Sequence, residues 1–76
     1  MIEWRSSWVV QGRTAGAGAT GELTAVRVGV VRTAVSERFA CQIGDGQTVI
    51  LTDEGAAKLI ANAREALADK ISGGAP

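Results

Sequence analysis

The sequence predicts an α+β protein in which a four-stranded antiparallel sheet is followed by one C-terminal amphipathic helix. Before residue 51, several short segments alternate apolar and polar residues, as half-buried strands do. From about Asp53 onward, apolar residues recur at helical spacing. A chain of 76 residues has room for one domain, which we expect over residues 1–72, with a frayed tail over residues 73–76.

Four strands are expected, at Ile2–Val10, Leu23–Thr33, Glu37–Ile43 and Gln47–Leu51. Between the first two lies QGRTAGAGATGE, residues 11–22, which offers no apolar side chain larger than alanine and is expected to be a mobile loop. Its Gly16, Gly18 and Gly21 match G-x-G-x-x-G. A dinucleotide site would need a helix after these glycines, whereas a strand follows, so a hairpin loop is favoured. A flap that covers an anionic ligand, with Arg13, is a further alternative.

The C-terminal half reads as a turn, a strand, an N-cap and a helix. Asp45-Gly46 is typical of a two-residue type I′ hairpin turn, which needs positive φ at both central positions. Thr52 or Asp53 can cap a helix that runs to about Ile71. The helix carries one apolar stripe, formed by Ala56, Leu59, Ile60, Ala63, Leu67 and Ile71. We expect this stripe to be buried on one face of the sheet, against Val26, Val28, Phe39, Cys41 and Val49 or Ile50.

One helix can cover only one face of a four-stranded sheet, so the other face is available to a ligand or partner. Alternation places Arg5, Arg27 and Arg38 on that face, where they can contact phosphates or form an ordinary solvated surface. Trp4 and Trp8 fall on the apolar face with Ile2 and Val10. They can be core residues, which is favoured, or can stack on nucleobases.

Residue types argue against an enzyme. The chain has no His and no Tyr, and its one Cys, Cys41, has no neighbouring base to activate it. No cluster of metal ligands and no cofactor motif is evident, so neither a metal nor a cofactor is expected. No leader or membrane-spanning run is recognised, and the lone Cys suits the cytoplasm. Because so short a chain buries a small core, we expect a homodimer.

The order of elements resembles that of the transcriptional coactivator family that binds single-stranded DNA as a dimer. The resemblance lies in the four strands before one helix and in the junction VILTDEGAAKL, residues 49–59. It implies a curved sheet whose ligand-facing side would carry Arg5, Arg27 and Arg38. The chain departs from the family in its zero net charge and in having no Lys before Lys58. The same junction is similar to that of short actinobacterial and phage proteins built as a sheet and a helix.

Two functions are therefore expected. The first is weak binding of single-stranded DNA or RNA by the basic sheet face, with Arg5, Arg13, Arg27, Arg38, Trp4 and Trp8 as candidate contacts. The alternative is a protein-interaction or accessory module that docks through its exposed sheet face or a strand edge. Steep salt dependence would distinguish the first from the second.

Overall fold

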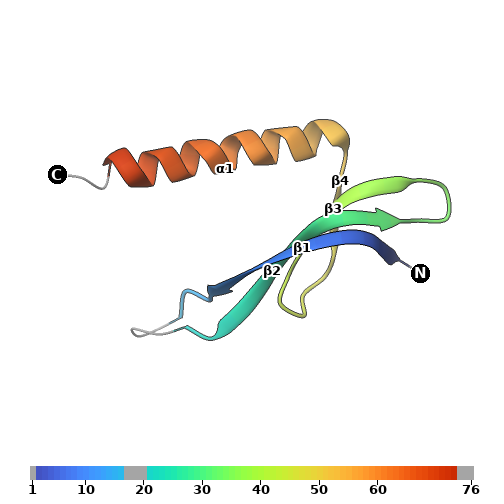
Figure 1. The fold of residues 1–76 in the computed structure, drawn as a ribbon, viewed down its shortest axis with the longest axis horizontal. Coiled ribbons are helices and arrows are strands. Elements are labelled where there is room, and N and C mark those ends of the chain that lie inside the picture. Colours follow the sequence, from blue (N-terminus) through green and yellow to red (C-terminus); the bar gives the residue numbers. More distant parts are fainter. Residues whose placement is uncertain (1, 17–20, 74–76) are drawn as a thin grey trace.

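The structure is a computed structural model, which describes residues 2–16 and 21–73. It confirms the α+β class: a four-stranded sheet, with strands in the order β1-β2-β3-β4 and all neighbours antiparallel, precedes one helix. The helix lies above one side of the sheet and diverges from it toward the C-terminus (Figure 1). The elements are β1 (Glu3–Arg13), β2 (Leu23–Arg32), β3 (Glu37–Ile43), β4 (Val49–Leu51) and α1 (Asp53–Gly73).

The β1–β2 hairpin is longer than the sequence predicts. Residues 11–13 pair with Ala25, Thr24 and Leu23, so the expectation that the loop begins at Gln11 is wrong. Strand pairing uses backbone groups, so these residues pair although they offer little to bury. Gly16 and Gly21 lie in the connection between two antiparallel strands, as the hairpin interpretation predicts, and Gly18 lies outside the described residues.

The turn between β3 and β4 differs from the expected two-residue hairpin. Five residues, 44–48, separate the strands. Gly44 has a positive φ of 57°. No described non-glycine residue, Asp45 included, has a positive φ. The type I′ prediction at Asp45-Gly46 is therefore wrong. The Gly44 amide donates to the Ala25 carbonyl at 2.8 Å and extends the contact with β2, so the chain turns one residue earlier than Asp-Gly suggests.

A β-bulge at Arg5 changes the face on which the start of β1 lies. Trp4 pairs with Val31, but Ser6 pairs with Val30, so one extra residue stands in β1. Because side chains alternate with period two, the extra residue moves Trp4 to the face opposite Trp8. The prediction that both tryptophans share one face is therefore wrong.

Register now defines the two faces of the sheet. Along most of its length the helix-facing face is apolar, and it carries Trp8, Val10, Val26, Val28, Val30, Phe39, Cys41, Ile43, Val49 and Leu51. At one end of the sheet this face also carries the charged residues Glu3, Arg32 and Glu37. The outer face points away from α1 and carries Trp4, Val9, Arg13, Ala25, Arg27, Gly29, Val31, Arg38, Ala40, Gln42 and Ile50. Gly29 lets β1 approach closely, because a Cβ there would stand 2.1 Å from the Ser6 carbonyl oxygen.

The helix does not cover the sheet as expected. Within the described residues α1 contacts only β3 and β4, and Ala56 is its one buried residue. Leu59, Ile60 and Leu67 are 41%, 50% and 60% exposed, so the predicted burial of the stripe is wrong for the single chain. Thr52 alone separates β4 from the helix and caps it, with its Oγ1 accepting from the Gly55 amide at 3.0 Å. With no loop to turn the chain back, the helix continues away from the sheet.

Candidate nucleic-acid interface

Three arginines form a diagonal row across the outer face. Arg13 on β1 stands opposite Leu23, and Arg38 on β3 stands opposite Val31. Arg27 lies on β2 midway between these two positions, four residues from each. Four residues of strand span about 13 Å, so the row extends over about 26 Å along the strand direction. Such a row has the form of a track along which an extended polyanion could lie. We call Arg13, Arg27 and Arg38 the arginine row.

The arginine row has no acidic partner among residues 2–16 and 21–73. The ion pairs found there involve other basic residues, and none includes a member of the row. Arg38 donates to the Ser36 hydroxyl at 3.0 Å, and Arg13 donates to the Gly21 carbonyl at 3.2 Å. These neutral acceptors hold the side chains without neutralising their charge, so the guanidinium groups keep their attraction for an anion.

Trp4 accompanies the row on the outer face. The guanidinium carbon of Arg27 lies 5.1 Å from the centroid of the Trp4 ring, within cation–π range. Trp4 is half-buried and pairs with Val31, which is fully buried. It therefore contributes both to the small core and to the surface around Arg27. An aromatic ring beside a cation is the pairing that single-stranded nucleic-acid sites use.

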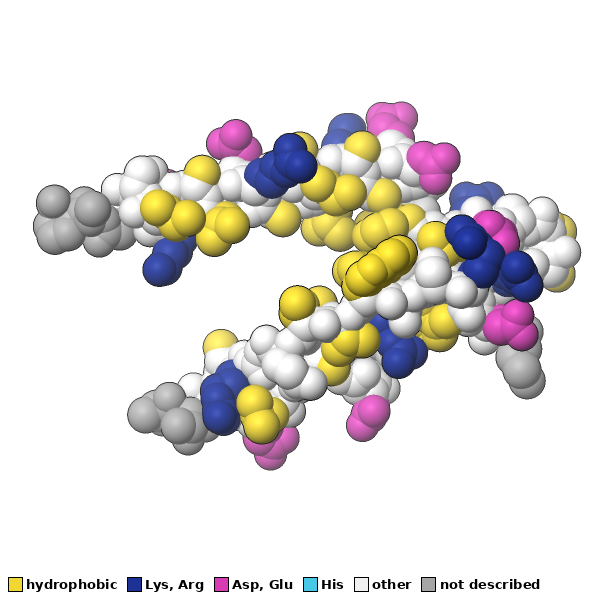
Figure 2. Space-filling view, viewed as in Figure 1, with side chains coloured by type: hydrophobic (Ala, Val, Ile, Leu, Met, Phe, Trp, Pro, Cys, Tyr) yellow, Lys and Arg dark blue, Asp and Glu magenta, His cyan; other side chains and the backbone are white. Residues whose placement is uncertain are grey.

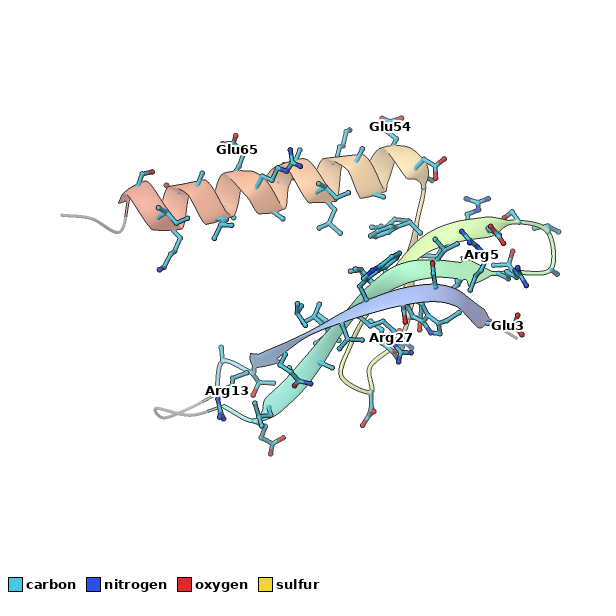
Figure 3. The ribbon with its side chains drawn as sticks, viewed as in Figure 1. Glu3, Arg5, Arg13, Arg27, Glu54 and Glu65 are labelled. Atoms are coloured by element: carbon cyan, nitrogen blue, oxygen red, sulfur yellow. The ribbon has the colours of Figure 1, made fainter. Side chains whose placement is uncertain are left out.

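Arg5 does not lie with the other arginines, and the prediction that Arg5, Arg27 and Arg38 share a face is wrong. The bulge places Arg5 beside Glu37, with 3.0 Å between its Nε and the carboxylate, and Figure 3 shows it on the opposite side of the sheet from Arg27. Glu37 also accepts from Arg32 Nε at 3.0 Å, and Arg32 lies 3.8 Å from Glu3. These four residues form an ion cluster at one end of the sheet.

The ion cluster alters the acidity of its central carboxylate. The hydrogen bond from Arg32 and the positive charges of Arg5 and Arg32 hold the pKa of Glu37 below its usual range, against a smaller opposing effect of desolvation. Glu37 therefore stays ionised and keeps Arg5 engaged, which makes Arg5 a structural residue in this fold. The sequence offers one hint of the bulge behind this arrangement, because Ser6 interrupts the apolar alternation between Trp4 and Trp8.

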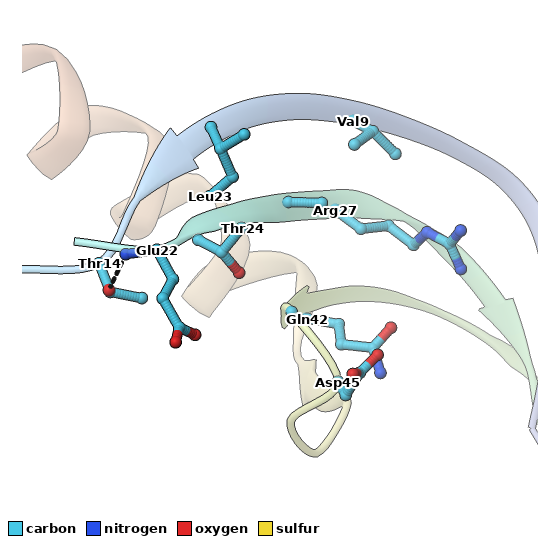
Figure 4. Close-up of a pocket in the computed structure, with 10 residues that line it drawn as sticks. Val9, Thr14, Glu22, Leu23, Thr24, Arg27, Gln42 and Asp45 are labelled. Atoms are coloured by element: carbon cyan, nitrogen blue, oxygen red, sulfur yellow. Dashed lines mark hydrogen bonds between the residues drawn. The ribbon is translucent and has the colours of Figure 1, made fainter. Parts of the chain in front are cut away.

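An open hollow of about 630 Å³ lies at the hairpin end of the outer face. Figure 4 shows Arg27 reaching along it, with Asp45 and Gln42 on one side and Glu22 at the other end. Gln42 donates to the Gly46 carbonyl at 2.8 Å, and the Thr14 hydroxyl accepts from the Glu22 amide at 3.0 Å. The two carboxylates balance the cation, so the hollow is less favourable to an anion than the surface between Arg27 and Arg38.

Trp8 lies apart from the arginine row, on the helix-facing face, and is 66% exposed. Cys41, on the same face, is half-buried. Within residues 2–16 and 21–73, no three acidic or cysteine side chains gather closely enough to hold a metal ion. In that same part of the chain, no helix has the length and apolar character needed to cross a membrane.

Comparison of the chain with family models, with curated proteins and with solved structures finds no match in any of the three.

Proposed function

We propose that this protein is a non-enzymatic binding module that holds single-stranded DNA or RNA weakly on the outer face of its sheet. The observation that carries the proposal is the arginine row, in which three arginines without carboxylate partners in the described chain follow one diagonal of a sheet. Trp4 beside Arg27 supplies a ring on which a base can stack. The resemblance in element order to the coactivator family adds support. We place this activity in the cytoplasm, where a lone thiol persists reduced.

Zero net charge limits the affinity, because most non-specific affinity for nucleic acid comes from phosphate neutralisation. With three arginine contacts on a single strand, log K should fall with log salt with a slope of about −2. Between 50 mM and 200 mM salt, this slope lowers affinity about 16-fold. A contact of this kind binds without reading sequence, since it engages backbone phosphates and one stacked base.

The test is fluorescence anisotropy with a labelled oligothymidine and its labelled oligouridine counterpart at the two salt concentrations. The variant R13A/R27A/R38A should lose the binding and the salt dependence together. The matched control K58A/R64A/K70A removes the same charge from α1 and should bind as the wild type does. Absence of binding by the wild type at low salt, or equal loss in both variants, would overturn the proposal.

A protein partner that adds a strand to β1 is the second candidate. β1 lies at an edge of the sheet and is eleven residues long, so its outer backbone groups are available for pairing. A proline within β1, as in V9P, would impair such pairing and leave the arginine row in place. Binding of a partner protein that is insensitive to salt and lost in V9P would favour this candidate.

A further inference from the structure

The molecule has an apolar cleft between α1 and the helix-facing face of the sheet. Figure 2 shows hydrophobic side chains on both arms, on the sides that face each other, with open space between them. Four large apolar side chains on the helix-facing face are 51–67% exposed, namely Trp8, Val10, Ile43 and Val49, while those nearer its centre are half-buried. Four on the helix are 41–66% exposed, namely Leu59, Ile60, Leu67 and Ile71.

The chain exposes far more surface than a compact monomer of its mass. Its accessible area is 6112 Å², whereas a folded monomer of 7.8 kDa is expected to expose about 4,400 Å². Its radius of gyration is 14.9 Å, against about 11.4 Å for a compact domain of 76 residues. The excess of about 1,700 Å² lies within the area that each subunit of an obligate homodimer buries, which is about 1,000–2,500 Å².

We propose that the apolar cleft is filled by helix α1 of a second copy of this chain, and that the two copies exchange helices reciprocally. The cleft has room for an apolar helix on the sheet, and the apolar stripe of α1 has no surface that covers it. Each chain therefore presents both halves of one interface, and reciprocal pairing of these halves between two copies closes a two-fold dimer. The six stripe residues are uncharged, and the one charge on the same side is Lys70, seven residues after Ala63 in the last turn of α1, where its long side chain can reach water.

The dimensions of the two arms suit this arrangement. The helix has 21 residues, which span about 31 Å, and β1 has 11 residues, which span about 37 Å. Charged side chains lie on the opposite side of α1, at Glu54, Lys58, Glu65 and Asp69. That side would face water in the dimer. Zero net charge on the chain also means that two copies do not repel each other at long range.

This inference does not rest on nucleic-acid binding, since the cleft and the arginine row lie on opposite faces of the sheet. In the dimer the two outer faces remain uncovered. Loss of the dimer and loss of nucleic-acid binding can therefore be observed separately.

The first test is the solution mass, measured by sedimentation equilibrium at micromolar concentration. We expect twice 7.8 kDa for the wild type. The variant I60K/L67K places two charges on the stripe and should give a chain of 7.8 kDa, folded or unfolded. A61K lies about 160° around the helix from Ala63 and should remain dimeric. A wild-type monomer mass would overturn the proposal.

The second test locates the contact and does not depend on a destabilised variant. The wild-type chain, whose one thiol is Cys41 on the helix-facing face, is mixed with the variant C41S/A63C and treated with a short bismaleimide. A covalent heterodimer is expected, identified by its mass. The control C41S/A61C carries its thiol on the far side of the helix and should give at least several-fold less product.

The variant A63C, which keeps Cys41 and so carries both thiols on one chain, tests a rival arrangement. In that arrangement α1 rotates about Thr52 and packs on the sheet of its own chain, without a second copy. That closure would produce an internal cross-link at the mass of one chain, independent of dilution. The reciprocal dimer should instead produce a cross-linked dimer whose yield falls on dilution. An internal cross-link in A63C, or equal heterodimer yields from C41S/A63C and C41S/A61C, would overturn the proposal.

Discussion

The Arg27 guanidinium lies over the Trp4 ring, with 5.1 Å between its central carbon and the ring centroid. This contact exists only because the bulge at Arg5 carries Trp4 to the outer face. It joins the start of β1 to the middle of β2 and places an aromatic surface within the arginine row. The same bulge sends Arg5 to the other face, where Glu37 holds it.

The contact predicts a measurable coupling between the two side chains. In a double-mutant cycle of W4A and R27A, the coupling free energy should be about 0.5–1 kcal/mol, the lower part of the range for cation–π pairs. The cycle of W8A and R27A is the control and should show no coupling, since Trp8 lies on the opposite face. Urea unfolding at one fixed protein concentration measures both. Equal coupling in the two cycles would contradict the assigned register.

Gly29 should tolerate no side chain. A Cβ there would meet the Ser6 carbonyl oxygen at 2.1 Å and the Ser7 Cα at 2.7 Å, both backbone atoms of β1. G29A should therefore destabilise the fold by about 1–3 kcal/mol, as overpacking does. Gly12, on the same pair of strands, has nothing within 4 Å of its Cβ position. G12A should leave the fold as stable or slightly more stable, and a similar loss in both variants would refute the steric explanation.

Thr52 should set the start of the helix. Its hydroxyl oxygen accepts from the Gly55 amide at 3.0 Å, and its carbonyl accepts from the Ala56 amide at 2.8 Å. T52A removes the side-chain cap and should cost about 1 kcal/mol of unfolding free energy. T52S retains the hydroxyl and should retain most of the stability. Urea unfolding, followed by the helical circular dichroism signal, measures the difference in unfolding free energy. Equal stability of T52A and T52S would show that the hydroxyl cap does not stabilise the helix.

Acid should weaken the ion cluster through Glu37. The hydrogen bond from Arg32 and the charges of Arg5 and Arg32 lower the pKa of Glu37 below its ordinary value of 4.5. The folded state therefore binds this proton less readily than the unfolded state does. The resulting stabilisation is complete above pH 4.5 and is lost as the pH falls through the lower folded value.

The variant E37Q tests this direction. Its stability deficit relative to the wild type should be present at neutral pH, shrink as the pH falls below 4.5, and shrink in high salt. E65Q on the helix is the control, because Glu65 forms no ion pair among residues 2–16 and 21–73. A deficit in E37Q that does not change with pH would contradict a role for the ionised carboxylate.

The candidate site was predictable only in part. Arg27 and Arg38 share the outer face as alternation indicates, because β2 and β3 pair without interruption. Arg13 joins them only because β1 continues to residue 13 through a segment whose composition resembles a loop. Arg5 and Trp4 lie elsewhere than predicted because one extra residue reverses alternation for everything before it. Alternation is a local signal, and a bulge is settled by pairing with the neighbouring strand.

By itself, the sequence determined the order of elements, the antiparallel sheet, the start of the helix at Asp53 and the apolar stripe along it. These follow from periodicity and capping, which act between residues close in the chain. Only the tertiary structure decided which face each tryptophan occupies, where the chain turns after Ile43, and that the stripe is buried within one chain only at Ala56. Those features depend on strand register and on the direction in which a one-residue junction sends the helix, and neither is encoded by local spacing.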